Sequence, residues 1–447
     1  MHDARNGARS AASAASLTGG RGPRRALRDL SLPIQALLPD VLAAARAERN
    51  LVLQAPTGAG KTTVVPLAAL EEDIADGLFV VLQPRRLACV SVARRMAELW
   101  GEPLGETVGY RMRHEAVVGN RTRLEVVTEG ILVRMLHANP SLDGVGCLFF
   151  DEFHERSVDS DLSFALALAA QRARNPRLKI VVMSATFGSL GRRVARLLGG
   201  CPLLRSEGRC FPVEVRHRGS MRPLLSEAAA AAQELEHRVA ETVRDALESH
   251  GGDVLAFLPG EQEIMYTWIF LNNMGIGDGR VPKRLISWAH KLIDRSAADP
   301  GRQVQVCPLY GTLEQEEQDE VLRPAAPGWR KVILATPIAE SSLTVPGVRV
   351  VVDSGLRRIK VFEAESCMSH MRTVPVSAAS AEQRRGRAGR VSAGLCFRLW
   401  SLEEHAGLEE SDEPELHRED LAPALLGAAA AGHAADEELA ALPWVDP

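Results

Sequence analysis

The stretch APTGAGKTT, residues 55–63, decides the fold class of this chain of 447 residues. It follows the apolar segment LVLQ (51–54), which is typical of a buried strand, and it precedes a run typical of a helix. A glycine-containing loop between a strand and a helix allows backbone N–H groups to close around phosphate oxygens. We therefore interpret residues 55–63 as a phosphate-binding loop.

The residue types of this loop each have a role in that interpretation. Gly58 and Gly60 let the backbone approach the phosphates, Lys61 can reach the β and γ phosphates, and Thr62 can bind Mg²⁺. Ala55 stands where the common pattern has its first glycine, which is a mild departure. The predicted nucleotide-binding residues of the loop are Thr57, Gly58, Ala59, Gly60, Lys61, Thr62 and Thr63.

A second stretch, CLFFDEFHERS at residues 147–157, places Asp151 and Glu152 directly after an apolar strand. An acid pair in such a position is unfavourable unless a cation meets it. Next to a phosphate-binding loop, the strand would deliver Asp151 to Mg²⁺, and Glu152 would then orient and deprotonate the attacking water. A solvated acidic turn is the alternative, and it fits poorly with the loop upstream.

Segments typical of strands and of helices alternate along most of the chain. Strands are expected at LFVVLQP (78–84), CLFF (147–150) and LKIVVMSAT (178–186), with helical segments between them. This alternation predicts βαβ units and a parallel sheet. Prolines around residues 200–222 predict a boundary, and a second α/β unit follows with a long helix from about Ser226 to His250.

The composition is that of a soluble globular protein, with 46% apolar and 25% charged residues. The formal net charge of −4 means that a site for a polyanion would depend on local arginine clusters. The seven cysteines lack the spacing of a zinc site and are typical of buried residues in a reducing cytoplasm. No apolar run approaches the ~18 residues of a membrane span, so we expect a cytoplasmic protein that does not enter a membrane.

Eight motifs in order resemble those of the DEAH-box helicases of superfamily 2, most closely the bacterial HrpB type. They are APTGAGKTT, QPRRLA (83–88), TEGIL (128–132), DEFHERS (151–157), SAT (184–186), FLPGEQEI (257–264), ATPIAESSLTVPGV (335–348) and QRRGRAGR (383–390). The resemblance covers roughly residues 30–447. It implies an α/β fold of two tandem RecA-like P-loop NTPase lobes with parallel sheets, followed by the start of a winged-helix domain.

The resemblance also divides the chain into parts. We expect a disordered tail at residues 1–28, a first lobe (helicase ATP-binding) at 29–205, a second lobe (helicase C-terminal) at 206–400 and a partial winged-helix region at 401–447. For the tail, a floppy segment or an early start codon is favoured over a transit peptide. Relatives continue beyond the end of this chain, so we expect a C-terminally truncated helicase that unwinds long duplexes poorly.

The stretch QRRGRAGR places Gln383, Arg387 and Arg390 four and three residues apart, which on a helix would put them on one face. The resemblance implies that they face the γ-phosphate and stabilise the charge of the transition state, as arginine fingers do. A basic surface helix is the alternative interpretation. Ser184 and Thr186 of SAT resemble residues that couple the state of the nucleotide to closure of the lobes.

Three more residues have roles that only the resemblance implies. His154 resembles the box histidine, which bridges the two lobes near the nucleotide. Arg95 is expected to stack on one side of the adenine. Leu356 is expected on the other side, where eukaryotic relatives carry Phe, and a leucine there predicts a relaxed nucleotide preference.

Contacts to nucleic acid are expected at the phosphate backbone and should therefore be independent of base sequence. The main candidates are Arg85, Arg86, Thr128 and Gly130, whereas Tyr110, Arg111 and Thr344 are as readily explained by structural roles. RNA is the expected partner. DNA stays open, because only contacts to the 2′-OH would separate the two polymers.

Two features depart from the family pattern. Pro337 takes the place of the usual Asn in ATPIAE and removes a backbone N–H at an interlobe position, which would impair coupling. Residues 265–302 are longer and more aromatic than the family norm, with a helical pattern around Leu285, Trp288 and Leu292. A surface insertion packed on the second lobe is favoured there over a binding site for a protein partner.

The sequence thus predicts an NTP hydrolase, an ATP-dependent RNA helicase or translocase that uses ATP and Mg²⁺ between its two lobes. The alternatives are an ATP-gated RNA-binding clamp without effective unwinding and a translocase that acts on DNA. Glu152, Arg387 and Arg390 favour the enzyme, whereas Pro337 and the expected C-terminal truncation favour the clamp. The sequence identifies neither the RNA, nor the pathway, nor the oligomeric state.

Overall fold

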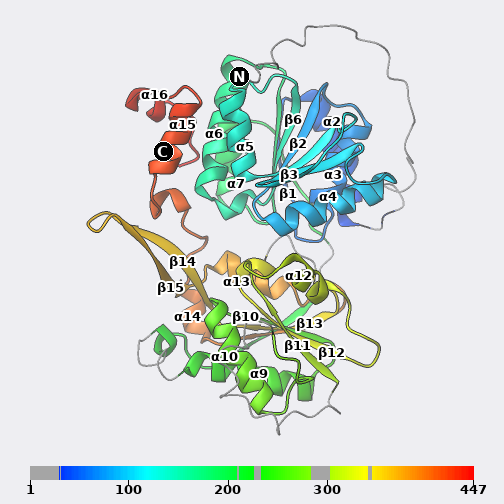
Figure 1. Cartoon of the computed structure of the whole chain (residues 1–447), viewed down its shortest axis with the longest axis vertical. Helices are drawn as coiled ribbons and strands as arrows, with labels where there is room; N and C mark the ends of the chain where they lie inside the picture. The colour runs from blue at the N-terminus through cyan, green and yellow to red at the C-terminus, as the bar shows by residue number, and fades with distance from the viewer. Residues whose placement is uncertain are drawn as a thin grey trace, which may run out of the picture.

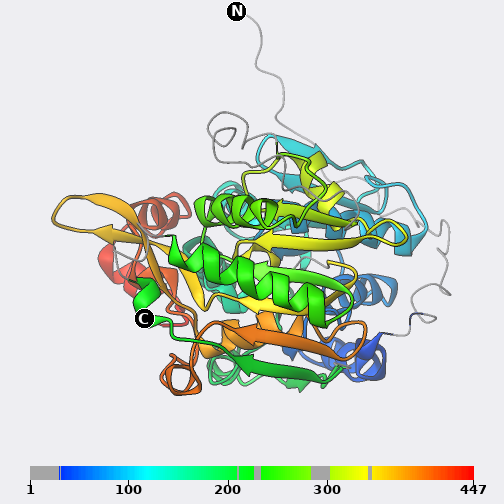
Figure 2. The same ribbon diagram turned by 90° about the horizontal axis from the view of Figure 1, so that it is seen from below.

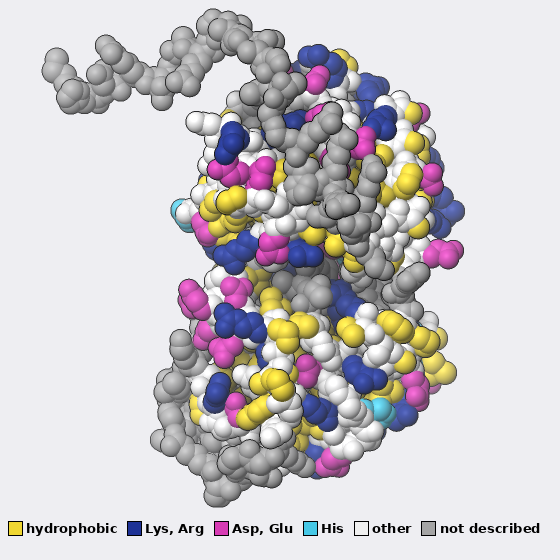
Figure 3. Space-filling view, turned by 90° about the vertical axis from the view of Figure 1, so that its right-hand side faces the viewer, with side chains coloured by type: hydrophobic (Ala, Val, Ile, Leu, Met, Phe, Trp, Pro, Cys, Tyr) yellow, Lys and Arg dark blue, Asp and Glu magenta, His cyan; other side chains and the backbone are white. Residues whose placement is uncertain are grey.

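The computed structural model of this chain describes residues 30, 32–208, 211–225, 233–282, 303–340 and 345–446. The predicted tail at residues 1–28, Thr344 and the helical pattern at 285–292 lie outside the described residues. Two lobes, each built on its own sheet, stand one above the other in Figure 1. The space-filling view shows a narrowing between them, with basic side chains on both sides of it (Figure 3).

The first lobe contains an eight-stranded sheet in the order β4-β3-β5-β2-β6-β7-β1-β8. Its strands are β1 Asn50–Gln54, β2 Leu78–Gln83, β3 Val108–Met112, β4 Glu115–Val117, β5 Leu124–Thr128, β6 Val145–Phe150, β7 Lys179–Ser184 and β8 Leu203–Arg205. Neighbouring strands pair in parallel, as predicted, except for the antiparallel pair β3–β4 at one edge.

Helices cover both faces of this sheet. They are η1 Pro33–Ala36, α2 Leu38–Ala47, α3 Lys61–Glu71, α4 Arg86–Trp100, α5 Glu129–Ala138, η2 Phe153–Glu155, α6 Val158–Ala173 and α7 Leu190–Leu197. Along β1, Leu51 and Leu53 enter one core and Val52 enters the other, because successive side chains of a strand point to opposite faces. A strand buried on both faces must be apolar throughout, which explains the continuous apolar runs in the sequence.

The segment before β1 consists of two helical pieces. The chain forms the short η1 and then α2, with a break at Leu37. Pro39 lies in the first turn of α2, where a missing N–H costs no hydrogen bond. The two pieces place Ile34 and Val41 in the core of the first lobe.

The second lobe contains a six-stranded sheet in the order β11-β12-β10-β13-β16-β9, with all neighbours parallel. Its strands are β9 Val213–His217, β10 Asp253–Phe257, β11 Val304–Leu309, β12 Arg330–Ala335, β13 Val348–Asp353 and β16 Gly394–Arg398. Its helices are η3 Arg222–Leu225, α9 Glu234–Ser249, α10 Glu261–Asn273, α12 Gln315–Leu322, η6 Pro337–Ala339 and α13 Ala378–Gly386. Seen from below, α9 and α10 (green) lie over the strands (Figure 2).

An antiparallel hairpin of β14 Leu356–Glu363 and β15 Met368–Pro375 projects from the second lobe (Figure 1). Its base is tied to neighbouring segments by ion pairs of Arg357 with Asp412 (2.6 Å) and of Arg358 with Glu263 (2.5 Å). The hairpin was not predicted from the sequence.

The C-terminal segment runs from the second lobe to the first. It contains α14 Leu402–Ala406, η7 Glu415–His417, α15 Ala422–Ala430 and α16 Asp436–Ala440. Ala424 and Ala428 of α15 pack in the same core as Leu162 of α6. The winged-helix character expected for 401–447 stays a prediction. Within the described part of the chain, no helix has the length and apolar content that crossing a membrane requires.

Candidate active site at the cleft between the lobes

The predicted phosphate-binding loop joins the end of β1 to the start of α3. Gly58 and Gly60 have φ angles of +84° and +95°, in the left-handed region that favours glycine. The turn η1 packs on the loop, since Ile34 N donates to Ala59 O (3.1 Å) and a Cβ on Gly60 would lie 2.9 Å from Leu32 Cδ1. The loop is thereby held in a shape that directs backbone N–H groups and the N-terminus of α3 to one place.

A cavity of about 420 Å³ lies over this loop. Residues of the first lobe that line it are Leu32, Thr57, Gly58, Gly60, Lys61, Thr62, Thr63, Ser91, Val92, Arg95 and Glu152. The second lobe contributes Leu322 and Arg390. Six of the seven loop residues predicted from the sequence therefore face the cavity, while the side chain of Ala59 is buried beneath it.

The acid pair lies directly against the loop. Asp151 Oδ2 accepts hydrogen bonds from Thr62 Oγ1 and Gln83 Nε2, both at 2.5 Å. Lys61 Nζ lies 2.8 Å from Glu152 Oε1 and 3.8 Å from Asp151 Oδ1. Lys61, Asp151 and Glu152 are each at most 3% exposed. The sequence reasoning missed Gln83, although its place at the end of a strand beside β6 puts it next to Asp151.

The charges of this cluster determine its protonation. Burial by itself would lower the pKa of Lys61, but Glu152 and Asp151 outweigh burial and raise that pKa. Burial would raise the pKa of Glu152, but the charge of Lys61, followed by that of His154, lowers it to about 2. For Asp151, burial prevails over Lys61 and the pKa is raised. Glu152 is therefore ionised at neutral pH.

The turn after the acid pair has an unusual backbone. Glu152 and Arg156, at its two ends, have φ angles of +52° and +51°, which cost about 1–3 kcal/mol for residues other than glycine. Such a turn persists only when its surroundings fix it. Arg156 is held by Asp161 (2.9 Å) and by Asp446 of the C-terminal segment (2.8 Å).

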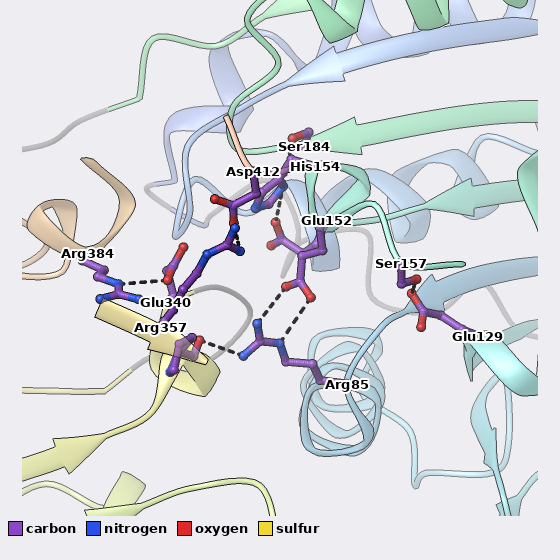
Figure 4. A network of polar contacts seen from close by, with 12 residues as sticks. Arg85, Glu129, Glu152, His154, Ser157, Ser184, Glu340, Arg357, Arg384 and Asp412 are labelled. Carbon is purple, nitrogen blue, oxygen red and sulfur yellow. Dashed lines mark hydrogen bonds and ion pairs between the residues drawn. The ribbon is translucent and has the colours of Figure 1, made fainter. Parts of the chain in front are cut away.

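His154 is also held within the first lobe (Figure 4). Its Nδ1 lies 3.0 Å from Ser184 Oγ and 3.6 Å from Glu152 Oε2. Ser184 is on β7 of the same lobe, so these two contacts do not cross the cleft, and the bridging role expected for His154 stays a prediction. The histidine connects Glu152 with the SAT motif.

Several polar contacts join the lobes, among them the ion pair of Arg94 with Asp319 (3.8 Å). Gln383 Nε2 donates to Thr186 Oγ1 (3.2 Å), and Arg85 Nη1 donates to Pro337 O (2.9 Å). Pro337 lacks an N–H, but its carbonyl still takes part in an interlobe hydrogen bond. The impaired coupling expected from the missing N–H stays a prediction.

The arginines of QRRGRAGR are not on one helix face as expected. Helix α13 ends at Gly386, so Arg387 and Arg390 lie on the turn that follows it. That turn still brings them to the site, since Arg390 lines the cavity and the charge of Glu152 acts on Arg387. Burial and the charge of Arg390 hold the pKa of Arg387 well below its usual range. Arg387 Nε donates to Glu340 O (3.1 Å).

Arg384, in the same stretch, has a different environment. It is fully buried and forms ion pairs with Asp353 (2.9 Å) and Glu340 (3.0 Å) inside the second lobe. Figure 4 shows Arg384 directed toward Glu340. The sequence did not separate this structural arginine from those that face the cleft.

The residues expected beside the nucleotide base are placed in part as predicted. Arg95 lines the cavity, whereas Leu356 is 1% exposed in the core of the second lobe. The structure therefore does not place Leu356 at the cavity, and Leu322 at the end of α12 is the apolar residue that the second lobe presents there. The sequence around Val321 and Leu322 did not indicate a role at the nucleotide site, because only the packing of the lobes shows which side chain reaches the cleft.

The candidates for nucleic-acid contact differ in their exposure. Arg86 and Gly130 are exposed, and Arg85 is paired with Glu155 (3.2 Å). Tyr110 is buried and bonds to Glu115, which supports the structural role that the sequence left open. Arg111 is paired with Glu125 (2.6 Å).

Comparisons with known proteins agree with this geometry. The DEAD/DEAH box helicase family matches residues 33–192, and the helicase conserved C-terminal domain matches residues 283–392. The chain is 41% identical over 396 residues to the ATP-dependent RNA helicase HrpB of Escherichia coli (strain K12), covering 89% of this chain and 44% of that protein. It is 33% identical over 417 residues to the ATP-dependent RNA helicase HrpA of the same organism, covering 93% and 29%.

A solved structure gives the same picture. The crystal structure of the Escherichia coli DEAH/RHA helicase HrpB matches with a TM-score of 0.79 and 39% identity, covering 93% of this chain and 48% of that one. The predicted pair of RecA-like lobes is thereby confirmed. The chain spans less than half the length of each of these relatives.

Proposed function

Since the chain belongs to the DEAD/DEAH box helicases, we propose that it is an ATP-dependent RNA helicase or translocase that hydrolyses NTP between its lobes. One observation carries this proposal. Lys61 and Glu152 of the first lobe and Leu322 and Arg390 of the second line a single cavity of about 420 Å³. A site formed by both lobes can change when they move, as ATP-driven translocation requires.

The site suits a Mg²⁺ ion that accompanies the nucleotide. Asp151 Oδ1 is buried and has no hydrogen-bond partner among the described residues, and Thr62 Oγ1 lies on the other side of the same carboxylate. Mg²⁺ prefers oxygen ligands and takes one or two from the protein when phosphates supply others. We infer that Thr62 and Asp151 hold it. The ion would neutralise negative charge on the phosphates.

Lys61 and Glu152 would part when a nucleotide binds. A lysine in this loop can reach the β and γ phosphates, and its ammonium would then leave the carboxylate of Glu152. The pKa of Glu152, which Lys61 now holds at about 2, would rise. Glu152 would thereby become a stronger base for the attacking water at the moment when a substrate is present.

Arg387 and Arg390 would stabilise the charge that develops on the transferred phosphoryl group. Both reach the cleft from the second lobe, so their action would depend on how the lobes are placed. The hydrogen bond from Gln383 to Thr186 crosses the same cleft and would report the position of the second lobe to the SAT motif. Hydrolysis and lobe movement would be coupled by these residues.

RNA would bind along the first lobe through its phosphate backbone. Arg86 and Gly130 are exposed at the start of α4 and α5, near the carboxyl ends of β2 and β5. The exposed backbone at a helix start and an arginine beside it suit phosphate groups.

We place the boundaries of the two lobes after Arg205 and after Trp400, as the sequence predicted.

The test is ATP hydrolysis by the purified chain with and without single-stranded RNA, with single-stranded DNA in a parallel series. We expect hydrolysis that RNA stimulates and that Glu152→Gln abolishes. A chain without NTP hydrolysis in all of these conditions would contradict the proposal, and stimulation by DNA alone would favour a translocase on DNA.

A further inference from the structure

Glu129 lies between two candidates for contact with nucleic acid and bonds to the turn that carries the catalytic acid. Thr128 ends β5 as the N-cap of α5, Glu129 is the first residue of that helix, and Gly130 is exposed. Ser157 Oγ donates a hydrogen bond of 2.5 Å to Glu129 Oε1 (Figure 4). Ser157 follows Glu152 by five residues.

The surroundings of Glu129 make its position costly for the fold. Glu129 is partly buried, its carboxyl group lies close to Glu155, Asp159 and Glu415, and among the described residues no cation is paired with it. Burial, with the charges of these three acids, raises the pKa of Glu129 to about 8, although the hydrogen bond from Ser157 lowers it in part. A partly buried acid beside three other acids and without a cation costs stability, so a role beyond stability is the better explanation.

The bond to Ser157 fixes one end of the turn that begins at Glu152. Ser157 also caps α6, because its Oγ accepts from Ser160 N (3.1 Å). Between Glu152 and Ser157 the backbone passes through two left-handed residues, so it has little freedom to absorb a displacement. A shift of the start of α5 would therefore move the turn, and with it the carboxylate of Glu152.

We propose that Glu129 is a positioning residue that transmits the binding of nucleic acid at Thr128 and Gly130 to Glu152, through its hydrogen bond with Ser157. This inference rests on the proposed function, and it identifies how RNA accelerates hydrolysis. Glu129 touches neither the nucleotide cavity nor the reacting atoms, since the residues that line the cavity do not include it.

The test compares Glu129→Ala with Glu129→Gln in the whole chain, with a single-stranded oligouridylate as the RNA. ATP hydrolysis is measured at saturating ATP and Mg²⁺ without RNA and with increasing RNA, and RNA affinity is measured separately by fluorescence anisotropy. Glu129→Ala should lower the RNA-stimulated kcat by about 2- to 30-fold, the range expected for residues that carry coupling. The rate without RNA and the Kd for RNA should stay within about twofold of the original chain.

Two further variants make the result specific. Glu129→Gln keeps an acceptor for Ser157 and should restore the stimulation. Asp159→Asn removes a charge from the same acidic group but leaves the Ser157 bond in place, so it should keep the stimulation. Adding Ser157→Ala to Glu129→Ala should cause no additional loss of stimulation, because both changes break the bond between these two residues. The cap of α6 that Ser157→Ala also removes should lower stability instead.

Several results would overturn the inference. If RNA stimulated Glu129→Ala fully, the hydrogen bond with Ser157 would not transmit RNA binding. The same would follow if Glu129→Gln lost as much RNA stimulation as Glu129→Ala. A higher Kd of Glu129→Ala for RNA would make Glu129 a binding residue. An equal loss of kcat with and without RNA would make its role purely structural. If the original chain hydrolyses ATP without any response to RNA, this inference fails alone. If it does not hydrolyse NTP, the proposed function fails as well.

Discussion

Lys61 and Glu152 form a buried ion pair in which Nζ lies 2.8 Å from Oε1. The pair links the phosphate-binding loop to the turn after β6, and each member is at most 3% exposed. Removing one partner of a buried pair leaves the other charge uncompensated, so the two residues are difficult to separate by mutation. An arriving phosphate gives Lys61 a new partner, and the remaining cost falls on Glu152, whose pKa rises when Lys61 leaves it.

Glu152→Gln tests the role of this carboxylate. Glutamine can still accept a hydrogen bond from Lys61 but cannot take a proton from water, while Asp151 is unchanged. We expect hydrolysis to fall about 10²- to 10⁴-fold, the usual contribution of a general base, with ATP affinity retained. Turnover and nucleotide binding should be measured on the same preparation. Near-normal turnover would remove Glu152 from the mechanism, and Glu155→Gln, in the same turn, provides the comparison.

Arg384 and Arg387 should give opposite phenotypes although they are three residues apart. Arg384→Met would leave Asp353 buried without its cation and should destabilise the fold by about 3–5 kcal/mol. Arg387→Met should cause little destabilisation, because burial beside Arg390 already disfavours its charge, but it should lower hydrolysis about a thousandfold or more. Denaturant unfolding and kcat, measured on both variants, check this. Equal effects on stability would contradict the assignment of Arg387 to the cleft.

Leu322 should control the affinity for the nucleotide base, and Leu356 should not. Leu322→Phe would add an aromatic face opposite Arg95 and should tighten nucleotide binding by about 1 kcal/mol, or about fivefold. Leu356→Ala should instead destabilise the second lobe by about 2–5 kcal/mol, as expected for a leucine that is 1% exposed. Affinities for ATP, GTP, CTP and UTP distinguish the two residues. A change in base preference with Leu356→Ala alone would restore the original assignment.

The raised pKa of Glu129 predicts that the stability of the fold depends on pH. Its pKa is raised from 4.5 to about 8 in the folded chain, so between these pH values the folded state holds a proton that the unfolded state has lost. Stability should therefore fall as pH rises from about 4.5 to about 8, and Glu129→Gln should remove this part of the loss. The difference in Tm between the variant and the original chain should grow across that interval.

The control for this experiment is Glu98→Gln, which changes an exposed glutamate on α4. Its Tm should follow that of the original chain at every pH between 5 and 8.5. If Glu129→Gln also followed the original chain in parallel, Glu129 would be ionised in the fold and its neighbours would have to compensate its charge.

Short-range patterns in the sequence determined the larger part of this protein. The phosphate-binding loop, the acid pair after β6 and the alternation of strands and helices depend on neighbouring residues, because a strand, a tight turn and a helix start are local structures. The alternation of strands and helices predicted parallel sheets, and burial of their strands on both faces explains the continuous apolar runs. From these patterns the two lobes, and the placement of Lys61 and Glu152 in one site, could be predicted.

Only the tertiary structure decided which distant residues complete the site. A periodic pattern could not show that α13 ends at Gly386, nor that Leu322 and not Leu356 reaches the cavity, because both depend on how the second lobe packs against the first. The bonds of Thr186 with Gln383 and of Glu129 with Ser157 join residues 197 and 28 positions apart. Contacts at such separations are determined by the packing of whole elements, and no local preference of the chain encodes them.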